Sequence, residues 1–149
     1  MANKIEIRNK KASHDYEFIE RYTAGVVLAG TEVKSLRLGK ASLVDAFCSF
    51  KDNELWIRNM HIAEYANRGY VNHDPFQERK LLLNRNELRK IQRKVKERGF
   101  TIVATRLYFS DKGYAKVDIA LARGKKEYDK REDIKKRDTQ RQDARINKL

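Results

Sequence analysis

The sequence predicts a mainly β fold: a small closed antiparallel β-barrel with two or three short helices and a basic C-terminal tail. Several stretches alternate apolar and polar residues with a period of two, which is typical of strands with one buried face. Turn-forming residues separate these stretches, and one amphipathic helix pattern interrupts them late in the chain. The last part of the chain is rich in charge and poor in apolar side chains. The strands are therefore expected to form the folded body, with the tail outside its core.

The first three strands precede residue 61. The first is predicted from Phe18 to Leu28, where aromatic and β-branched residues are frequent, with Gly25 and Gly30 marking bends. The next two form a hairpin. Its parts are an alternating strand at Val44, Ala46, Cys48 and Phe50, a turn at Asp52-Asn53, and a returning arm from Leu55 to Met60.

One clear helix is predicted between this hairpin and the next. Its apolar positions recur at helical spacing, at Leu88, Ile91 and Val95, with Leu81 one heptad earlier. Asn84 with Glu87 three residues on is typical of a capping box, and Gly99 ends the helix. The opposite face is basic and holds Arg89, Lys90, Arg93, Lys94, Lys96 and Arg98.

A second hairpin follows the helix. Residues 100–109 are rich in β-branched and aromatic side chains, and residues 110–113 have the composition of a turn. The returning strand buries one face, at Ala115, Val117, Ile119 and Leu121. At least five strands with one helix inserted late match a small closed barrel of the oligonucleotide-binding type. That class often binds nucleic acid, although a fold alone does not establish function.

Both the body, residues 1–122, and the tail, residues 123–149, are basic. The chain carries 34 Lys or Arg against 21 Asp or Glu, a net charge of +13. The tail holds eleven of these bases and six of the acids, so +5 lies there and +8 lies in the body. Two basic parts favour bipartite binding to nucleic acid, in which neutralised phosphates supply most of the attraction.

The tail is predicted to become helical only against a partner. It contains no proline and one glycine, Gly124, but too few apolar residues to build a core. In a helix its cations would share one face, at Lys130, Arg137, Arg141, Arg145 and Lys148. The alternative is a solvated charged extension that serves only solubility.

Composition argues against several other classes of protein. No run approaches the ~20 apolar residues that a membrane span needs, and the N-terminus lacks the apolar segment of a secretion signal. We therefore expect a cytoplasmic protein that does not bind membranes. Cys48 is the only cysteine and lies in an apolar strand pattern, so we expect a buried hydrophobic residue rather than a nucleophile.

A metal-dependent nuclease is the enzymatic alternative. The residues that would supply ligands to a divalent ion are His14, His61, His73, Asp15, Asp45 and Asp74. Their spacing matches no metal motif, and the chain has no Walker, GxSxG or CxxC motif. We therefore expect no enzymatic activity, no metal and no cofactor.

The segment from Glu64 to Glu78 is the longest irregular stretch and contains the only proline, Pro75. It mixes cations with flat rings, at Arg68, Tyr70, His73 and Phe76. Such a mixture holds phosphates while it stacks on bases. The alternative is a surface connection whose aromatic groups pin it to the barrel.

Three sequence strings, in this order, resemble the SsrA-binding protein (small protein B) family. They are GTEVKSLRLGKASLVDAF at residues 30–47, NRGYVNHDPFQERKLLLN at residues 67–84 and LYFSDKGYAKVDIALARGKKEYDKRE at residues 107–132. The resemblance extends from about Asn9 to the C-terminus. It implies a barrel of the oligonucleotide-binding kind and a tail that is unstructured alone and helical on the ribosome.

The resemblance also implies a function and partners. Members of the family bind the tRNA-like domain of transfer-messenger RNA and rescue ribosomes stalled on messages that lack a stop codon. Their body fills the place of the missing anticodon stem in the decoding site of the small subunit, and their tail lies in the empty message channel. The expected partners are therefore transfer-messenger RNA and the ribosome, with the elongation factor Tu complex as an indirect partner. We expect a monomer.

Functional residues follow where the strings match. The positions that the resemblance associates with the tRNA-like domain, or that adjoin them, are Asn9, Lys10, His14, Glu32, Lys34, Arg37, Leu82 and Asn84. The ribosome-binding positions of the tail are Lys125, Lys126, Tyr128, Asp129, Lys130, Arg131, Arg137, Arg141, Arg145 and Ile146, with Gly124 as a hinge. Tyr128 stands where many members carry His, which favours stacking over any role that needs a protonated imidazole.

Structural alternatives stay open for three of these residues. Glu32 suits the first turn of a short helix, where a carboxylate interacts favourably with the helix dipole. Asn84 is a candidate helix cap, and burial explains Leu82 equally well. If Glu32 meets RNA, it does so as a hydrogen-bond acceptor or by orienting Lys34 or Arg37. A generic single-strand RNA chaperone is the competing function within the nucleic-acid-binding class.

Overall fold

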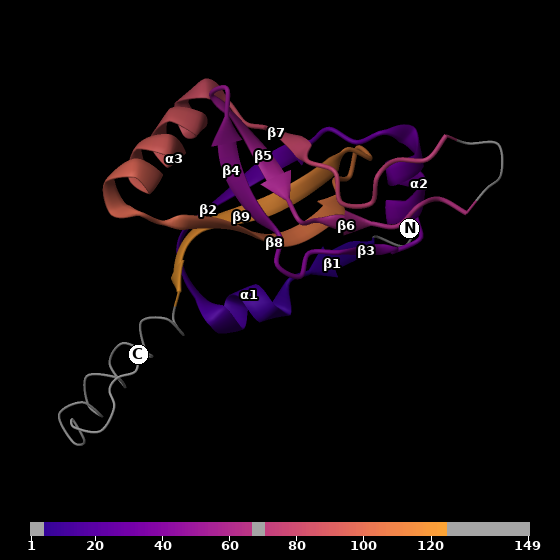
Figure 1. Cartoon of the computed structure of the whole chain (residues 1–149), viewed down its shortest axis with the longest axis horizontal. Helices are drawn as coiled ribbons and strands as arrows, with labels where there is room; N and C mark the ends of the chain where they lie inside the picture. Colours follow the sequence, from indigo (N-terminus) through magenta and orange to yellow (C-terminus); the bar gives the residue numbers. More distant parts are fainter. Residues whose placement is uncertain (1–4, 67–70, 125–149) are drawn as a thin grey trace, which may run out of the picture.

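The computed structural model describes residues 5–66 and 71–124 (Figure 1). Its helices and strands are mostly those that alternation and capping residues predict, with several short ones added. In chain order they are β1 (Glu6–Arg8), α1 (Lys10–Asp15), β2 (Tyr16–Val26), α2 (Gly30–Arg37), β3 (Ala41–Ser42), β4 (Phe47–Lys51), β5 (Glu54–Arg58), β6 (His61–Ile62), β7 (Arg79–Leu82), α3 (Arg85–Arg98), β8 (Thr101–Phe109) and β9 (Ala115–Gly124).

The strands pair antiparallel and close into a ring. A seven-stranded sheet has the order β1-β8-β4-β5-β7-β2-β9, and β8 also pairs with β9. This last pairing joins β9 to β8 and closes a ring of β8, β4, β5, β7, β2 and β9, with β1 attached to β8 outside the ring. Strand β8 pairs with β4 through Ile102 and Val103 and with β1 through its second half. Strands β3 and β6 form a separate two-stranded sheet. The predicted mainly β, closed antiparallel fold is confirmed.

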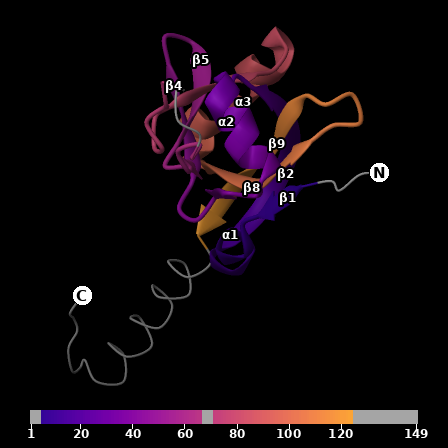
Figure 2. The same cartoon turned by 90° about the vertical axis from the view of Figure 1, so that its right-hand side faces the viewer.

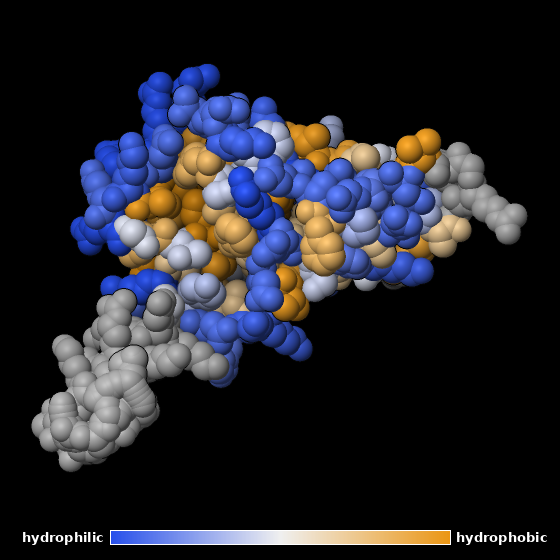
Figure 3. Space-filling view, viewed as in Figure 1, coloured by the Kyte–Doolittle hydropathy of each residue, from blue (hydrophilic) through white to orange (hydrophobic). Residues whose placement is uncertain are grey.

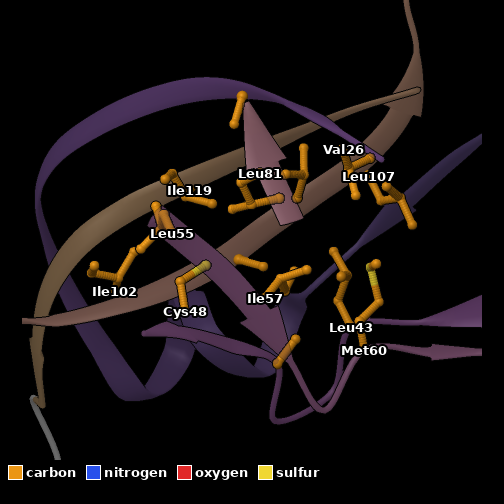
Figure 4. Packing of buried hydrophobic residues seen from close by; sticks show 14 of the residues in the cluster. Val26, Leu43, Cys48, Leu55, Ile57, Met60, Leu81, Ile102, Leu107 and Ile119 are labelled. Carbon is orange, nitrogen blue, oxygen red and sulfur yellow. The ribbon is translucent and has the colours of Figure 1, made fainter. Parts of the chain in front are cut away.

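The ring encloses one apolar core (Figure 4). Alternate residues of the strands point inward, so that Leu55, Ile57 and Ile119 have almost no exposed surface. Cys48 is buried among them, as the sequence predicts. Burial raises the pKa of its thiol, and a protonated thiol is a poor nucleophile.

The helices cover three different parts of the ring. Helix α3 and helix α2 lie toward opposite ends of the long axis, and α1 lies below the sheet (Figures 1 and 2). Ala12 of α1 packs on Val103, Ala120 and Ala122 in a small second cluster. Because of this cluster β9 is buried on both faces near its end, where the sequence pattern predicted only one buried face.

The ends of α3 confirm the predicted capping residues. The Asn84 side-chain oxygen accepts a hydrogen bond from the Glu87 backbone N–H at 2.9 Å. Gly99 adopts a left-handed conformation with φ of 70°, which glycine allows at little cost. The inclusion of Leu81 in the helix pattern was wrong, because Leu81 is buried in β7. A strand that leads directly into a helix cap continues the apolar run, so periodicity alone does not separate the two.

The body extends slightly beyond the predicted boundary at residue 122. Strand β9 continues to Gly124, which pairs with Tyr16 at the start of β2. The Arg123 guanidinium also forms an ion pair with Glu17 at 2.9 Å. Residues 123 and 124 thus belong to the sheet.

Candidate nucleic-acid interface

The outward surface of β7, β2, β9 and β8 carries one of the exposed predicted binding residues, Leu82. Strand register places Leu82, Gly25, Lys116 and Tyr108 in one row across these strands. Directly paired residues of antiparallel strands point to the same side of the sheet. A second row consists of Thr23, Asp118 and Arg106, each two residues from the first row on its own strand. We call this surface the outer β face, defined by Leu82, Gly25, Lys116, Tyr108, Thr23, Asp118 and Arg106.

Leu82 is exposed at one edge of the outer β face. Leu82 is 53% exposed, and its side chain lies over Gly25. A Cβ atom added at Gly25 would lie 3.4 Å from the Leu82 Cβ, so the glycine leaves room for the leucine to lie close to the strand. The burial alternative for Leu82 is therefore wrong. An exposed leucine in a row with a lysine offers apolar contact beside a phosphate-binding cation.

The second row is held in place by hydrogen bonds around Asp118. The Thr23 hydroxyl donates to this carboxylate at 2.9 Å, and the Arg106 Nε donates to it at 3.0 Å. The Arg106 guanidinium also lies 3.9 Å from the centroid of the Tyr108 ring. Partial burial by itself lowers the pKa of Arg106, but hydrogen bonding to Glu6 and the charge of Asp118 outweigh it and raise this pKa above its ordinary value. Arg106 is thus a fixed cation stacked on an aromatic ring.

The outer β face continues into a cleft beside α1. The cleft has a volume of about 380 Å³ and lies between α1 and strands β1, β2, β8 and β9. Its lining includes four cations, Arg8, Lys10, Arg21 and Arg106, against one carboxylate, Asp118, which is paired with Arg106. Of the predicted RNA-binding residues, Lys10 is exposed at this cleft, while Leu82 lies at the other edge of the same face. Several cations around one cleft favour a polyanion.

Asn9, which caps α1, and His14, near the end of α1, have different environments. Asn9 is buried: its amide nitrogen donates to the Leu43 and Ala104 carbonyls at 2.9 and 2.8 Å, and its oxygen caps the helix at the Ala12 N–H. These bonds fix the position of α1, and Asn9 is itself part of the cleft lining. The His14 ring is exposed and lies 3.1 Å from the Asp15 carboxylate.

Glu32 lies in the interior of the protein, not on the outer β face. Both Glu32 and Arg79 have side chains that are 1% exposed, and their charged groups meet at 2.5 Å. The carboxylate also accepts hydrogen bonds from the Ala29 backbone N–H and the Gln77 side chain. Arg79 in turn donates to the Met60 carbonyl. Glu32 thus caps the first turn of α2, which agrees with the structural role considered for it from the sequence. Its pair with Arg79 also connects α2 to the start of β7.

Comparison with known proteins identifies the family. The family described as "SmpB protein" matches residues 6–149. The chain belongs to the SmpB protein family. Among named relatives, the SsrA-binding protein of Phocaeicola vulgatus is 59% identical over 95% of this chain and 95% of its own length. The SsrA-binding protein of Bacteroides thetaiotaomicron is 58% identical with the same coverage.

A solved structure supports the same assignment for the fold of this SmpB family protein. It is described as "tmRNA-SmpB: a journey to the center of the bacterial ribosome". The similar chain in it is 49% identical, with a TM-score of 0.68, and the match covers 83% of this chain and 85% of that one.

Three other predicted residues lie outside the outer β face and the cleft beside α1, or at their border. Lys34 and Arg37 are exposed on α2; the Lys34 ammonium lies 6.0 Å from the Tyr65 ring, and the Arg37 guanidinium lies 5.6 Å from the Phe109 ring. Asn84 is exposed two residues beyond Leu82 and is already used as the α3 cap. A capping role and an RNA contact are compatible, because the amide nitrogen is separate from the capping oxygen.

The irregular segment from Glu64 to Glu78 is pinned to this SmpB family fold through His73. One ring nitrogen of His73 lies 2.8 Å from the Thr31 hydroxyl, and the other lies 2.8 Å from the Ile62 carbonyl. Phe76 packs against His61. His73 therefore has the role that the structural alternative predicts, since it holds this segment to the barrel. Arg68 and Tyr70 lie outside the described residues. Every predicted tail residue beyond Gly124 also lies outside them.

Two negative findings apply to residues 5–66 and 71–124. These residues include no group of three or more His, Cys, Asp or Glu side chains placed to hold a metal ion. They also include no helix that is long and apolar enough to cross a membrane.

Sequence reasoning missed several residues of the outer β face and of the cleft beside α1. They are Arg8, Arg21, Thr23, Arg106, Tyr108, Lys116 and Asp118. Only strand register brings them together, since β2 and β9 are about a hundred residues apart in sequence. The alternation in β9 did point Lys116 and Asp118 away from the core, which was the one available signal.

Proposed function

We propose that this SmpB family protein binds the tRNA-like domain of transfer-messenger RNA and acts in trans-translation. The family match along residues 6–149 carries this proposal. The names of the relatives, SsrA-binding protein, and the subject of the solved structure support it. The outer β face and the cleft beside α1 are the surface that we assign to this RNA, because they combine exposed apolar contact with four cations.

The finer mechanism is part of the same proposal. The compact body takes the volume of the anticodon stem that the tRNA-like domain lacks, and the basic tail enters the empty message channel of the stalled ribosome. This division explains why the charge is spread over two parts of the chain, +8 and +5. The protein works as a cytoplasmic monomer without enzymatic activity, and it meets the elongation factor Tu complex only through the RNA.

Leu82→Ala is expected to weaken binding of the tRNA-like domain about fivefold to tenfold. Covering a half-exposed leucine with RNA contributes roughly 1–1.5 kcal/mol, which the alanine loses. The measurement is a binding titration with the isolated tRNA-like domain. Val44→Ala is the matched control, because Val44 is similarly exposed at 52% but lies off the outer β face. Equal effects of the two variants would remove Leu82 from the interface.

Salt should weaken this binding steeply. If six or more phosphates are neutralised, affinity falls at least about 10³-fold between 50 and 200 mM monovalent salt, because each contact releases counterions. A titration series at several salt concentrations gives the slope.

Two further tests separate the competing functions. An unstructured RNA of equal length is the competitor in a binding titration, because a generic single-strand chaperone would bind it as well as the tRNA-like domain. RNA degradation that needs divalent metal and stops with chelator would instead indicate a nuclease.

A further inference from the structure

A groove runs along one flank of α3, between this helix and the hairpin of β4 and β5. It consists of two adjoining hollows of about 430 and 420 Å³, whose linings share Gln92. The first hollow lies at the start of the helix and the second at its end. Figure 3 shows the apolar surface of the second hollow directly below the hydrophilic outer side of α3. We call the two hollows together the α3 groove.

One wall of the α3 groove is cationic. Arg85, Arg89 and Lys96 belong to its lining and are exposed on α3. Their spacing of four and seven residues places them on one side of the helix. The ion pairs of the described residues involve none of the three. The lining also contains one acid, Glu54, which lies 3.6 Å from the Lys80 ammonium. The three cations are therefore available to phosphate groups.

The floor of the α3 groove is apolar and contains two aromatic rings. Phe50 of β4 and Phe100, directly before β8, line the second hollow together with Val95. Both phenylalanines pack against the core and remain partly exposed. A flat ring that is held by the core and reached from outside is a stacking platform for a base.

A single-stranded RNA matches this combination of wall and floor. Proteins that bind single strands combine a positively charged groove along the backbone with aromatic side chains on which the bases stack. The bases of a double helix are already stacked and paired, so they do not reach such rings. Helix α3 has 14 residues and is therefore about 21 Å long. We expect room for about four nucleotides, which is the lower end of the site sizes known for oligonucleotide-binding folds.

The α3 groove is separate from the outer β face. Leu82 is exposed on that face, whereas the next residue, Leu83, lines the groove. Asn84 follows as the helix cap and Arg85 as the first cation of the groove. The two surfaces thus adjoin at the start of α3 without sharing a residue.

We propose that the α3 groove binds a short segment of single-stranded RNA. The bases stack on Phe50 and Phe100, and the phosphates lie along Arg85, Arg89 and Lys96. This site does not depend on the proposed recognition of the tRNA-like domain, which uses other residues. Because the groove holds only a few nucleotides, its affinity for an unstructured RNA is lower than the affinity of the outer β face for a folded partner.

A fluorescent oligonucleotide of six uridines tests the proposal in a binding titration with the full-length protein. Phe100→Leu keeps an apolar side chain but removes the ring, so it should weaken binding about fivefold or more. Phe76→Leu is the matched control, because Phe76 is 59% exposed and lies outside the groove lining. An equal loss with Leu82→Ala would overturn the proposal, since it would place the oligonucleotide on the outer β face.

Arg89→Gln and Lys90→Gln form a second matched pair. The two residues are adjacent and exposed on α3, and each substitution removes one positive charge, but only Arg89 lines the groove. The slope of log affinity against log salt concentration should become shallower by about 0.7 in Arg89→Gln, because one phosphate contact is lost. Lys90→Gln should keep the parent slope. Equal slopes of the two variants would contradict a groove that tracks the RNA backbone.

Backbone amide signals in the magnetic resonance spectrum locate the bound oligonucleotide. Adding the six-uridine RNA should shift the signals of Phe100 and Ile102, which line the groove. Unshifted signals would overturn the proposal, because the oligonucleotide would then bind elsewhere on the chain. A shift with an acidic peptide of alternating glutamate and phenylalanine, but not with the RNA, would also overturn it. The groove would then be a docking surface for a protein.

Discussion

Arg79→Met is expected to lower the free energy of unfolding by about 3–5 kcal/mol. The substitution leaves the Glu32 carboxylate buried without its cation, at a site where both side chains are 1% exposed. It also removes the hydrogen bonds from Arg79 to the Met60 and Pro75 carbonyls, of which the Pro75 carbonyl keeps the Ile62 backbone N–H as a donor. Urea unfolding of the full-length protein, followed by circular dichroism, measures the change.

Lys51→Met is the matched control for this prediction. Lys51 forms an ion pair with Glu78 at 3.1 Å, with side chains that are 49% and 31% exposed. Removing a pair in contact with water should cost less than about 1 kcal/mol. A similar loss of stability for Lys51→Met and Arg79→Met would show that burial is not what makes the Glu32–Arg79 pair important.

The double variant Glu32→Leu with Arg79→Met tests the same pair from the other side. Replacing both charges removes the isolated carboxylate, so the double variant should be more stable than Arg79→Met alone. An additive or larger loss would contradict the account. It would mean that the packing of these two side chains, rather than their charges, holds α2 against β7.

This pair also changes how an effect of Glu32 on RNA binding is interpreted. Glu32 belongs to α2, whereas Arg79 begins the strand that ends with Leu82. Loss of the pair frees the start of that strand and the segment before it, and the Leu82 row depends on the register of the strand with β2. A Glu32→Ala variant should therefore lose RNA affinity in proportion to its loss of stability, without a direct contact between Glu32 and RNA.

The elements that were predictable from the sequence are those with a local signal. Alternation predicted β4 and β9, β-branched and aromatic composition predicted β2 and β8, and the turn at Asp52-Asn53 predicted β5 as a returning arm. The α3 caps at Asn84 and Gly99 were predicted from residue type alone. Strands β1, β3 and β6 have two or three residues, which is too short for any period to show. Their pairing depends on distant partners, as for β1 with the second half of β8.

The site was less predictable than the fold because it depends on contacts between distant residues. The partner of Glu32 lies 47 positions away, and nothing local to EVKSLR indicates it. Leu82 is one of three consecutive leucines, of which Leu81 is buried and Leu82 exposed. The pleat explains that alternation once the strand is known, and the glycine opposite explains why an outward leucine lies so close to the sheet.

Truncation after Gly124 is expected to abolish tagging of stalled chains while leaving RNA affinity nearly unchanged. The cut keeps β9 whole, including the Gly124–Tyr16 pairing and the Arg123–Glu17 ion pair. All residues of the outer β face and of the cleft beside α1 remain, so affinity for the tRNA-like domain should change less than about threefold at moderate salt. Tagging needs the removed cations in the message channel, so it should fall below detection in a reconstituted translation reaction on a message without a stop codon.

A cut after Ala122 is the informative companion. It removes Arg123 and Gly124 from the sheet, so any extra loss of RNA affinity relative to the cut after Gly124 reports on the end of β9 rather than on the tail. Parallel loss of affinity and tagging by the cut after Gly124 would contradict a two-part protein, because it would place RNA-binding groups beyond the body. Retained tagging would also contradict a two-part protein, because the body without its tail would then be sufficient on the ribosome.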